Sequence, residues 1–163
     1  MMKLERPSEK DEKDFVLMME KWRAFGGRIN PKLLRFFNGD YEAWLERMRK
    51  FWDGIGDGIY PHEHLFFVKK DSLLIGATSI RHQSTYCSIA YGIAPDFRNR
   101  GYGKETLRLI LSEARRMNLK KVRIICDVDN IASQKIIESC GGIFDKREYK
   151  KSILINSYRL ELE

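Results

Sequence analysis

The sequence predicts one mixed α/β domain with a mostly antiparallel sheet flanked by helices. Three observations lead to this expectation. The 163-residue chain is 43% apolar, which suits one domain whose core needs neither disulfides nor metal. Some segments show the short apolar runs and two-residue alternation of strands, and others repeat apolar residues at helical spacing. No internal repeat, low-complexity tract or linker divides the chain, so we expect residues 1–163 to form a single domain.

The first half of the chain is predicted to form a short strand, two helices and three strands. Apolar residues recur every three or four positions in both helical stretches, and Asp40 is placed to cap the second helix. The elements expected, in order, are a strand over Lys3–Arg6, helices over Asp14–Phe25 and Asp40–Phe51, a loop over Gly54–Gly58, and strands over Leu65–Lys70, Leu73–Arg81 and Tyr86–Ile93. Three strands in succession favour an antiparallel meander.

The second half alternates helices with strands and then ends in a hairpin. An apolar stripe between residues 107 and 114 predicts a helix after the third strand of the meander. The elements expected after it are a strand over Val122–Cys126, a helix over Ile131–Cys140 ended by Gly141 and Gly142, and strands over Ile143–Tyr149 and Ile153–Leu162. The order strand, helix, strand implies a parallel pair with a right-handed crossover.

Composition excludes several classes of protein. No run approaches the roughly 18 apolar residues needed to cross a bilayer, so we expect no membrane-spanning segment. The start, Met1–Arg6, lacks the apolar stretch of a secretory signal, and we expect a cytoplasmic protein. The cysteines Cys87, Cys126 and Cys140 are odd in number and form no CxxC motif. They are therefore predicted to be reduced thiols of the core.

The net charge of +7 is the one compositional sign of function. It favours an anionic partner, whether nucleic acid, a phosphate-bearing cofactor or a membrane surface. Between Asp96 and Arg123 there are nine basic and three acidic residues, so nearly all of the excess lies in this stretch. This concentration favours a local phosphate site, with the outer Arg and Lys side chains of the helix solvated.

The segment from Ile93 to Lys104, between a strand and a helix, is interpreted as an anion-binding loop. Gly101 and Gly103 let the backbone turn tightly and present its N–H groups at the positive end of the helix. Arg98, Arg100 and Lys104 add positive charge. The alternative is a glycine-bearing loop before an ordinary helix, and an isolated GxG is a weak signal.

The wider context of this loop resembles the GNAT superfamily of acyl-CoA-dependent N-acetyltransferases. The resemblance covers most of the chain and lies in the order Ile-x-Pro, Arg-x-x-Gly-x-Gly, an apolar helix, a strand, and Asn130-x-x-Ser133. The stretches Tyr91–Gly103 and Cys126–Ser133, with Gly141-Gly142 downstream, are similar to a bacterial branch of predicted acetyltransferases without an assigned substrate.

The resemblance implies a sheet of about six to seven strands whose central pair splays apart. The pantetheine arm of acetyl-CoA is then expected between the strand ending at Ile93 and the strand ending near Cys126, bonded to the backbone near Tyr91 and Ile93. The residues expected to bind the pyrophosphate are Arg98, Asn99, Arg100, Gly101, Tyr102, Gly103 and Lys104. Asn130 and Ser133 are expected to contact the arm, although Asn130 is equally suited to cap the next helix. Residues 1–82 would form the acceptor side and residues 83–163 the acetyl-CoA side.

The implied reaction is direct attack by a primary amine on the thioester, which needs a proton acceptor for the amine and a donor for the departing thiolate. Many members take the donor from a Tyr seven residues after the Asn, but Ile137 stands there in this sequence. The candidate donors are Tyr91, Tyr86 and Cys140, with Tyr149 or water as further options. The candidate bases are Asp127, Glu63, His64 and His82.

Two features near the presumed acceptor side remain open. Arg81 and His82 end a strand and are predicted to contact the substrate, with solvated surface as the alternative. His62 and His64 alternate around Glu63, which places two imidazoles on one face of a strand. No third or fourth ligand is evident from the sequence, so no metal site is predicted.

Two other functions compete with the acetyltransferase. A non-catalytic acyl-CoA-binding module on the same fold is made credible by Ile137. A nucleic-acid-binding domain is motivated by the net charge, but the sequence has no stripe of basic residues interleaved with stacking aromatics. We therefore expect acetyl-CoA and an amine acceptor as partners, no membrane or nucleic acid, and edge strands at the C-terminus that permit a homodimer.

Overall fold

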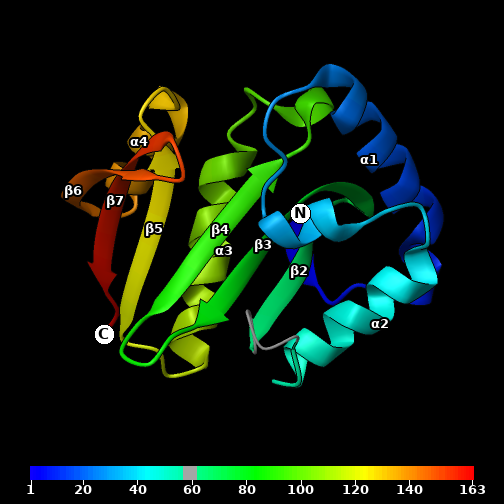
Figure 1. The fold of residues 1–163 in the computed structure, drawn as a ribbon, viewed down its shortest axis with the longest axis horizontal. Helices are drawn as coiled ribbons and strands as arrows, with labels where there is room; N and C mark the ends of the chain where they lie inside the picture. The colour runs from blue at the N-terminus through cyan, green and yellow to red at the C-terminus, as the bar shows by residue number, and fades with distance from the viewer. Residues whose placement is uncertain (57–61) are drawn as a thin grey trace.

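The computed structural model describes residues 1–56 and 62–163, and its centre is a seven-stranded sheet (Figure 1). The strands are β1 (Met2–Glu5), β2 (Glu63–Lys70), β3 (Leu73–His82), β4 (Cys87–Ile93), β5 (Lys121–Asp127), β6 (Ile143–Lys150) and β7 (Ile153–Glu161). The α-helices in the described ranges are α1 (Glu12–Phe25), α2 (Tyr41–Trp52), α3 (Tyr102–Arg116) and α4 (Ile131–Ser139). The predicted mixed α/β class is confirmed.

The predicted helices and strands are all present. Their boundaries differ by at most two residues, except that α3 begins five residues before the apolar stripe 107–114 that predicted it. Asp40 caps α2 as expected, because its Oδ1 accepts the N–H of Ala43 at 3.0 Å. Three short 3₁₀ helices were not predicted, since three to five residues carry no periodic signal: η1 (Glu9–Asp11), η2 (Lys32–Phe36) and η3 (Pro95–Phe97). The loop expected over Gly54–Gly58 falls partly on residues 57–61, which lie outside the described residues.

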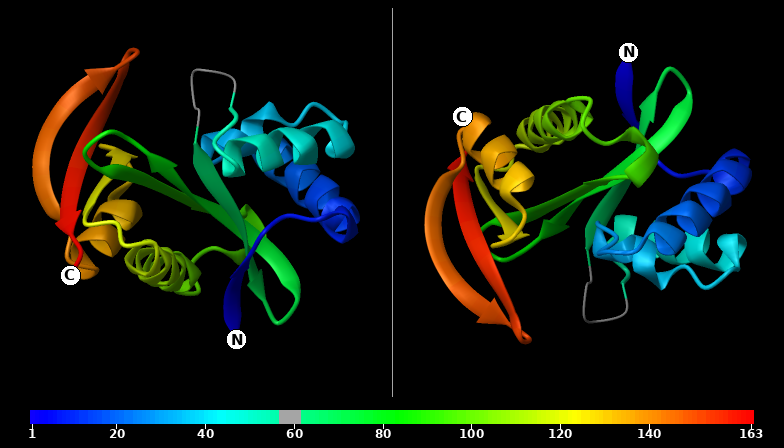
Figure 2. Two further views of the ribbon diagram at one scale, coloured as in Figure 1. Left: turned by 90° about the horizontal axis from the view of Figure 1, so that it is seen from below. Right: turned by 90° about the horizontal axis from the view of Figure 1, so that it is seen from above.

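The sheet has the strand order β1-β2-β3-β4-β5-β7-β6, and all its pairs are antiparallel except β4 with β5. β7 lies between β5 and β6, so the C-terminal hairpin adds to the sheet through its second strand. The parallel pair runs only from Cys87↔Val122 to Ile89↔Ile124. The sheet therefore consists of two halves that diverge between β4 and β5, as the resemblance implied (Figure 2).

The helices cover opposite faces of the sheet (Figure 2). One apolar cluster packs α1 and α2 against one face and includes Phe15, Trp44 and Phe67. A second cluster packs α3 and α4 against the other face and includes Leu107 and Tyr158. Within the described chain, no helix combines the length and apolar composition needed to cross a membrane.

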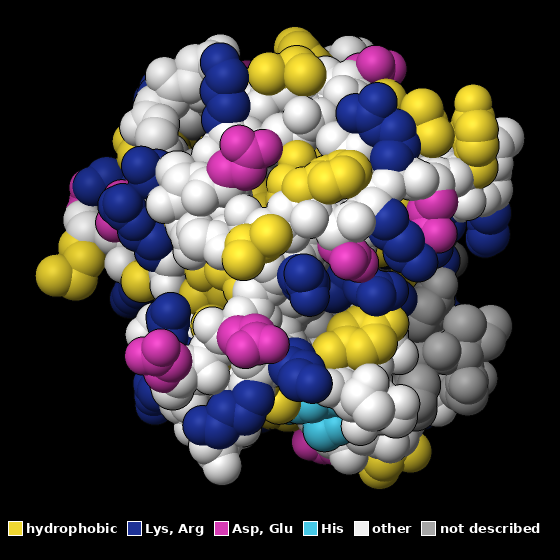
Figure 3. Space-filling model, turned by 90° about the vertical axis from the view of Figure 1, so that its left-hand side faces the viewer, with side chains coloured by type: hydrophobic (Ala, Val, Ile, Leu, Met, Phe, Trp, Pro, Cys, Tyr) yellow, Lys and Arg dark blue, Asp and Glu magenta, His cyan; other side chains and the backbone are white. Residues whose placement is uncertain are grey.

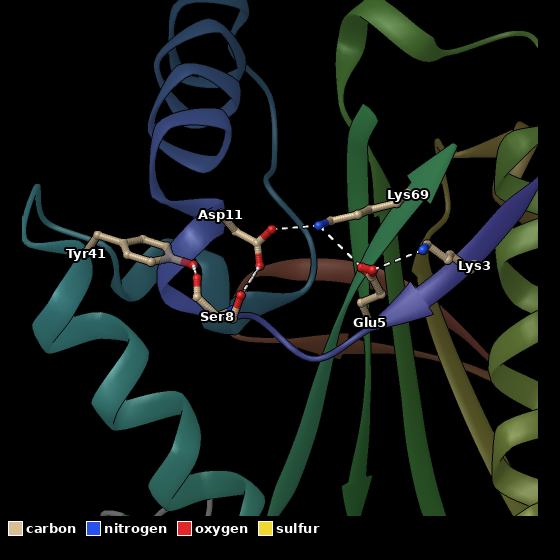
Figure 4. Close-up of polar contacts among 6 residues, drawn as sticks. All are labelled: Lys3, Glu5, Ser8, Asp11, Tyr41 and Lys69. Atoms are coloured by element: carbon tan, nitrogen blue, oxygen red, sulfur yellow. Dashed lines mark hydrogen bonds and ion pairs between the residues drawn. The ribbon is translucent and has the colours of Figure 1, made fainter. Parts of the chain in front are cut away.

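A polar network beneath the first cluster ties β1, η1, α2 and β2 together (Figure 4). The ammonium of Lys69 lies 2.6 Å from Asp11 Oδ1 and 3.4 Å from Glu5 Oε2. Asp11 also accepts the N–H of Ser8 at 2.9 Å, and Tyr41 donates its hydroxyl to the carbonyl of Ser8 at 2.8 Å. Burial raises the pKa of Asp11, but the hydrogen bonds from Lys69 and Ser8 outweigh burial and leave it below its usual value. The network fixes the N-terminal segment on the sheet.

The cysteine prediction is right for two residues and wrong for the third. Cys87 and Cys126 are buried free thiols, and burial raises the pKa of each to about 11. Cys140 is also a free thiol but is only half-buried, because it follows the last turn of α4 at the edge of the second cluster.

Candidate active site

The gap between β4 and β5 exposes a backbone edge on each strand. Beyond Ile89 the described parts of the two strands no longer pair, while β4 stays paired to β3 as far as Ile93 and β5 to β7 as far as Asp127. The N–H of Ala94 points toward β3 and donates to the carbonyl of Ile75. The carbonyl of Ile93 points away from β3 and accepts from the side chain of Arg98. Because backbone groups alternate along a strand, those of Tyr91 also face the gap. An extended polar ligand can complete this edge.

The loop that follows β4 makes the tight turn expected from its glycines, and residues 98–104 are called the anion-binding turn after their predicted role. Asn99 and Gly101 have φ angles of 63° and 82°, and Gly101 is the N-cap of α3. The first backbone bond within α3 runs from the N–H of Glu105 to the carbonyl of Gly101 at 3.2 Å. The preceding amides, those of residues 102–104, therefore lie at the positive end of a 15-residue helix and are available to an anion.

Arg98 has a different position from the one expected of a phosphate ligand. Its Nε donates to the carbonyl of Ile93 at 2.9 Å, and its guanidinium lies over the rings of Trp22 and Phe25 at 5.7 and 5.5 Å. Burial lowers the pKa of Arg98. This side chain is bonded to the end of β4. The other basic residues of the turn are Arg100, whose guanidinium lies 6.0 Å from the centre of the Phe97 ring, and Lys104.

Tyr91 and Ser133 meet across the gap. The side chain of Tyr91 extends from β4, and its hydroxyl lies 2.9 Å from Ser133 Oγ on α4. A Cβ built on Gly103 would lie 3.8 Å from the Tyr91 ring and 3.1 Å from Ile136, so α3 approaches both neighbours closely here. Burial raises the pKa of Tyr91 to about 12, and the phenol keeps its proton at neutral pH. Asn130 caps α4, because its Oδ1 accepts the N–H of Ser133 at 3.0 Å.

The position where many relatives carry a Tyr is part of the apolar core. Ile137 is fully buried, and a Cβ on Gly142 would overlap it. Of the predicted proton donors, Tyr91 lies against the anion-binding turn, and Cys140 is close enough to Tyr91 to contribute to the rise in its pKa. Tyr86 precedes β4 at its far end, under the guanidinium of Arg123, and Tyr149 on β6 is 73% exposed.

The side of the gap toward α1 is bordered by residues 28–30, a segment whose position the sequence did not reveal. Arg28 Nη1 lies 2.9 Å from Asp127 Oδ1 at the end of β5, which makes Asp127 an ion-pair partner. The carbonyl of Asn30 lies where a Cβ on Gly92 of β4 would be, so any other residue at position 92 would overlap it. The segment 28–30 thus contacts both strands that border the gap. Gly92 lies within a strand and precedes no turn, and such a glycine can indicate that another backbone segment approaches closely.

The side chains of Arg81 and His82 lie on opposite faces of the sheet. Arg81 Nε donates to the buried carboxylate of Glu63 at 2.9 Å. Glu63 and Leu65 are two residues apart and share the face of β2 that packs against α1 and α2. His82 lies beside His64 on the opposite face. Substrate contact by Arg81 and by His82 therefore stays a prediction, and the two side chains would reach a substrate from opposite faces of the sheet.

No third ligand beside His62 and His64 was evident from the sequence, but the structure brings a third imidazole, that of His82, to them. His82 Nε2 lies 3.0 Å from His64 Nδ1, and the rings of His82 and His62 stack at 4.2 Å. All three lie near the start of β2 and the end of β3, away from the anion-binding turn at the opposite end of β4.

The sequence over residues 2–143 matches the family described as acetyltransferase (GNAT) domain. No curated protein matches the chain in sequence. Solved structures with the same fold include RimL, a ribosomal L7/L12 alpha-N-protein acetyltransferase in complex with coenzyme A, at 15% identity and a TM-score of 0.78, covering 99% of this chain and 94% of that chain.

Two further structures are similar over almost their whole length. An acetyltransferase from Salmonella typhimurium that modifies the N-terminal serine of L7/L12 is 15% identical with a TM-score of 0.76, covering 99% of this chain and 95% of that chain. The microcin C7 self-immunity acetyltransferase MccE, in complex with acetyl-CoA and AMP, is 18% identical with a TM-score of 0.72, covering 99% and 92%. Because the family match spans most of the sequence, this chain belongs to the GNAT family of acetyltransferases.

Proposed function

We propose that this protein transfers an acetyl group from acetyl-CoA to a primary amine of a small molecule, peptide or protein. The observation that carries the proposal is the meeting of two features at one end of β4: an open backbone edge facing β5 and the N-terminal amides of α3. In this proposal residues 1–163 act as one domain, with residues 1–82 on the acceptor side and 83–163 on the cofactor side.

The residues present suit acetyl-CoA. The amides of Tyr102, Gly103 and Lys104 would hold the pyrophosphate, with charge from Arg100 and Lys104. The backbone of Tyr91 would bond the pantetheine arm along the edge of β4, next to Ser133 on α4. The neighbours RimL and MccE, which are described with coenzyme A or acetyl-CoA, support the same cofactor.

The thioester supplies an activated acyl group, and this chain supplies orientation and proton transfer. Attack forms a C–N bond and breaks the C–S bond, and the proton lost by the amine balances the one gained by the coenzyme A sulfur. Tyr91 is the best-placed donor for the sulfur, because its hydroxyl keeps its proton and lies in the gap with Ser133. The backbone N–H of Tyr91 or Ile93 would stabilise the oxyanion. No metal takes part in this scheme.

The acceptor would approach from the side of the gap that segment 28–30 borders. The acidic side chain there, Asp127, is already paired with Arg28. An incoming ammonium group would compete with this guanidinium for the carboxylate, so Asp127 would hold it near the thioester. The ammonium would lose one proton, to water or to Asp127, before the neutral amine attacks. RimL acts on a protein amino terminus, which supports an amine as the acceptor group without naming the molecule.

The test is release of free coenzyme A thiol by the purified protein with acetyl-CoA and a panel of amines. The panel includes polyamines, amino sugars and peptides with free amino termini. Turnover on at least one amine, together with a mass increase of one acetyl group in that amine, is the expected result. Absence of turnover on the whole panel, despite binding of acetyl-CoA, would favour the second candidate.

That second candidate is a non-catalytic acyl-CoA-binding module on the same fold. The burial of Ile137 in the core favours it, because no hydroxyl stands at the position where many relatives carry a proton donor. The two candidates share the cofactor site and differ only in turnover, so the thiol-release assay separates them.

A further inference from the structure

The three histidines of this chain, the full number in its 163 residues, lie together at one end of the sheet. His62 precedes β2, His64 lies at its start and His82 ends β3. One ring nitrogen of each lies within 4.8 Å of the other two. In Figure 3 the histidine side chains (cyan) reach the surface at the lower edge of the face shown.

The register of β2 and β3 explains this convergence. His62 and His64 are two residues apart, so their side chains emerge on the same face. The N–H of His82 donates to the carbonyl of His62 at 3.0 Å, which places these residues opposite each other. An irregularity between Val68 and Lys69 shifts the pairing by one residue. Without this shift His82 would emerge on the other face of the sheet.

The surroundings leave the imidazole nitrogens directed at one another. The nearest carboxylate in the sequence, Glu63, lies on the opposite face and is bonded to Arg81. His64 packs its ring edge-on against Trp52 at 4.5 Å and is buried, while His62 and His82 are half-buried and border solvent. The charged side chains that act on His64 are Arg6, whose guanidinium lies over the Trp52 ring, and Asp53. Neutral imidazole is the form that binds metals.

We propose that His62, His64 and His82 bind one divalent transition-metal ion of the Zn²⁺ class, leaving a fourth position for water. Three imidazoles and one open position form a recurring Zn²⁺ site, and imidazole suits late first-row metals. Zn–N bonds of about 2.0–2.1 Å place tetrahedral ligand atoms about 3.3 Å apart. The nitrogens here lie from 3.0 Å to within 4.8 Å of one another. Rotation of the half-buried His62 and His82 side chains would bring the three nitrogens to the spacing of about 3.3 Å that a tetrahedral site needs.

This metal site is separate from the transfer site. His82 pairs with Cys87 at the start of β4, and Tyr91 lies four residues further on, or about 13 Å along the strand. The ion would cross-link the beginning of β2 to the end of β3, which stabilises this part of the sheet by binding only the folded state. Acyl transfer would not need it, so the proposal stands or fails independently of the acetyltransferase activity.

The experiment titrates tag-free protein, stripped with chelator, with ZnCl₂ by calorimetry and with CoCl₂ by visible absorption. We expect one Zn²⁺ per chain, a rise in melting temperature, and Co²⁺ bands of a four-coordinate site. His62→Gln and His82→Gln alter half-buried side chains and should each weaken Zn²⁺ binding by at least about 100-fold, beyond the 10–100-fold typical of outer-shell partners. Circular dichroism checks that each variant is folded.

Cys140→Ser is the matched control, because Cys140 is a half-buried thiol that a metal would otherwise reach. This variant should bind Zn²⁺ as the wild type does. The proposal is overturned if the wild type binds no Zn²⁺ at a Zn²⁺ concentration of about 100 μM. A dissociation constant of that size corresponds to a binding free energy of only about 5 kcal/mol. It is equally overturned if a folded His62→Gln or His82→Gln protein keeps the wild-type affinity, or if Cys140→Ser removes binding.

Discussion

Gly101 and Gly103 serve the anion-binding turn for different physical reasons. Gly101 has open space around its Cα but a φ of 82°, which side chains with a Cβ rarely adopt. Gly103 has helical geometry, and its constraint is space, because Ile136 of α4 lies 3.1 Å from a Cβ built there. Conformation is therefore decisive at the first glycine and packing at the second.

Gly101→Ala should weaken acetyl-CoA binding by about 5- to 30-fold, because αL geometry costs a residue with a Cβ roughly 1–2 kcal/mol and the turn will relax away from it. Calorimetric titration with acetyl-CoA measures the effect. Gly39→Ala is the matched control, since Gly39 has a φ of 107°, open surroundings and a place before α2, far along the chain from the turn. Equal losses of cofactor affinity in both variants would contradict a role for the turn in binding.

Tyr91→Phe should lower kcat by about 100-fold, the lower end of the range for general acid catalysis. The ring would remain in place, so the affinity for acetyl-CoA should change little. Steady-state thiol release gives kcat, and calorimetry gives the affinity. Tyr86→Phe, which removes a hydroxyl at the far end of β4, should leave both values unchanged. A Tyr91→Phe enzyme with wild-type kcat would assign the proton to water or to another group.

The sequence predicted the elements well and their irregularities poorly. Sequence patterns located every α-helix and strand that the structure describes, and the order of elements implied the parallel pair of β4 and β5. The register shift between Val68 and Lys69 leaves no periodic signal, yet it decides that His82 joins His62 and His64. For that reason two of the three imidazoles were predictable as a group and the third was not.

In the candidate site, too, the sequence predicted local features but not contacts between distant segments. The turn at Gly101 and the cap at Asn130 follow from local residue types, because a positive φ and an N-cap each select few residues. Contacts between distant segments do not follow, since nothing local to Arg98 predicts that it donates to Ile93 and packs over Trp22. The contact of Asn30 with Gly92 is equally non-local.

Gly92→Ala should displace segment 28–30 from β4, because the added methyl overlaps the carbonyl of Asn30. Overpacking of this kind typically costs about 1–3 kcal/mol of stability. We also expect a larger rise in KM for the amine than for acetyl-CoA, since the displaced segment borders the acceptor side. Two-substrate kinetics and thermal unfolding measure both effects. Equal rises in the two KM values would place segment 28–30 outside the acceptor path.

The molecule as a whole joins two packed halves through one sheet, and the network around Lys69 anchors the N-terminal half. Asp11 and Glu5 both face this ammonium, and Lys3 lies 3.3 Å from Glu5. The ammonium side chain is 11% exposed and the Asp11 side chain 5%. At this level of burial, removing one charge leaves its partner poorly solvated.

Lys69→Met should destabilise the protein by about 3 kcal/mol at pH 7, because it leaves the Asp11 carboxylate buried without its partner. Urea unfolding gives the value. Lys146→Met is the matched control, since Lys146 lies 3.3 Å from Glu148 on the exposed strand β6 and its loss should cost less than about 1 kcal/mol. Similar losses in the two variants would show that burial does not strengthen the network.

The same network predicts the acid limit of stability. The pKa of Asp11 lies below its unfolded value of 3.8 in the folded protein. Asp11 therefore stabilises the fold fully at pH values well above 3.8, and this contribution fades as the pH falls through the folded pKa. Unfolding free energies measured from pH 6 down to about pH 2.5 should fall more steeply in the wild type than in Lys69→Met. If the unfolding free energies of the two proteins fell in parallel with pH, the lowered pKa of Asp11 would not arise from Lys69.

The most direct test of the proposed function is calorimetric titration of the wild-type protein with acetyl-CoA. The open edge of β4 and the amides at the start of α3 predict one acetyl-CoA bound per chain, with affinity that Gly101→Ala reduces and Gly39→Ala does not. No binding of acetyl-CoA at millimolar concentration by a folded wild-type protein would contradict the assignment of this gap as the cofactor site.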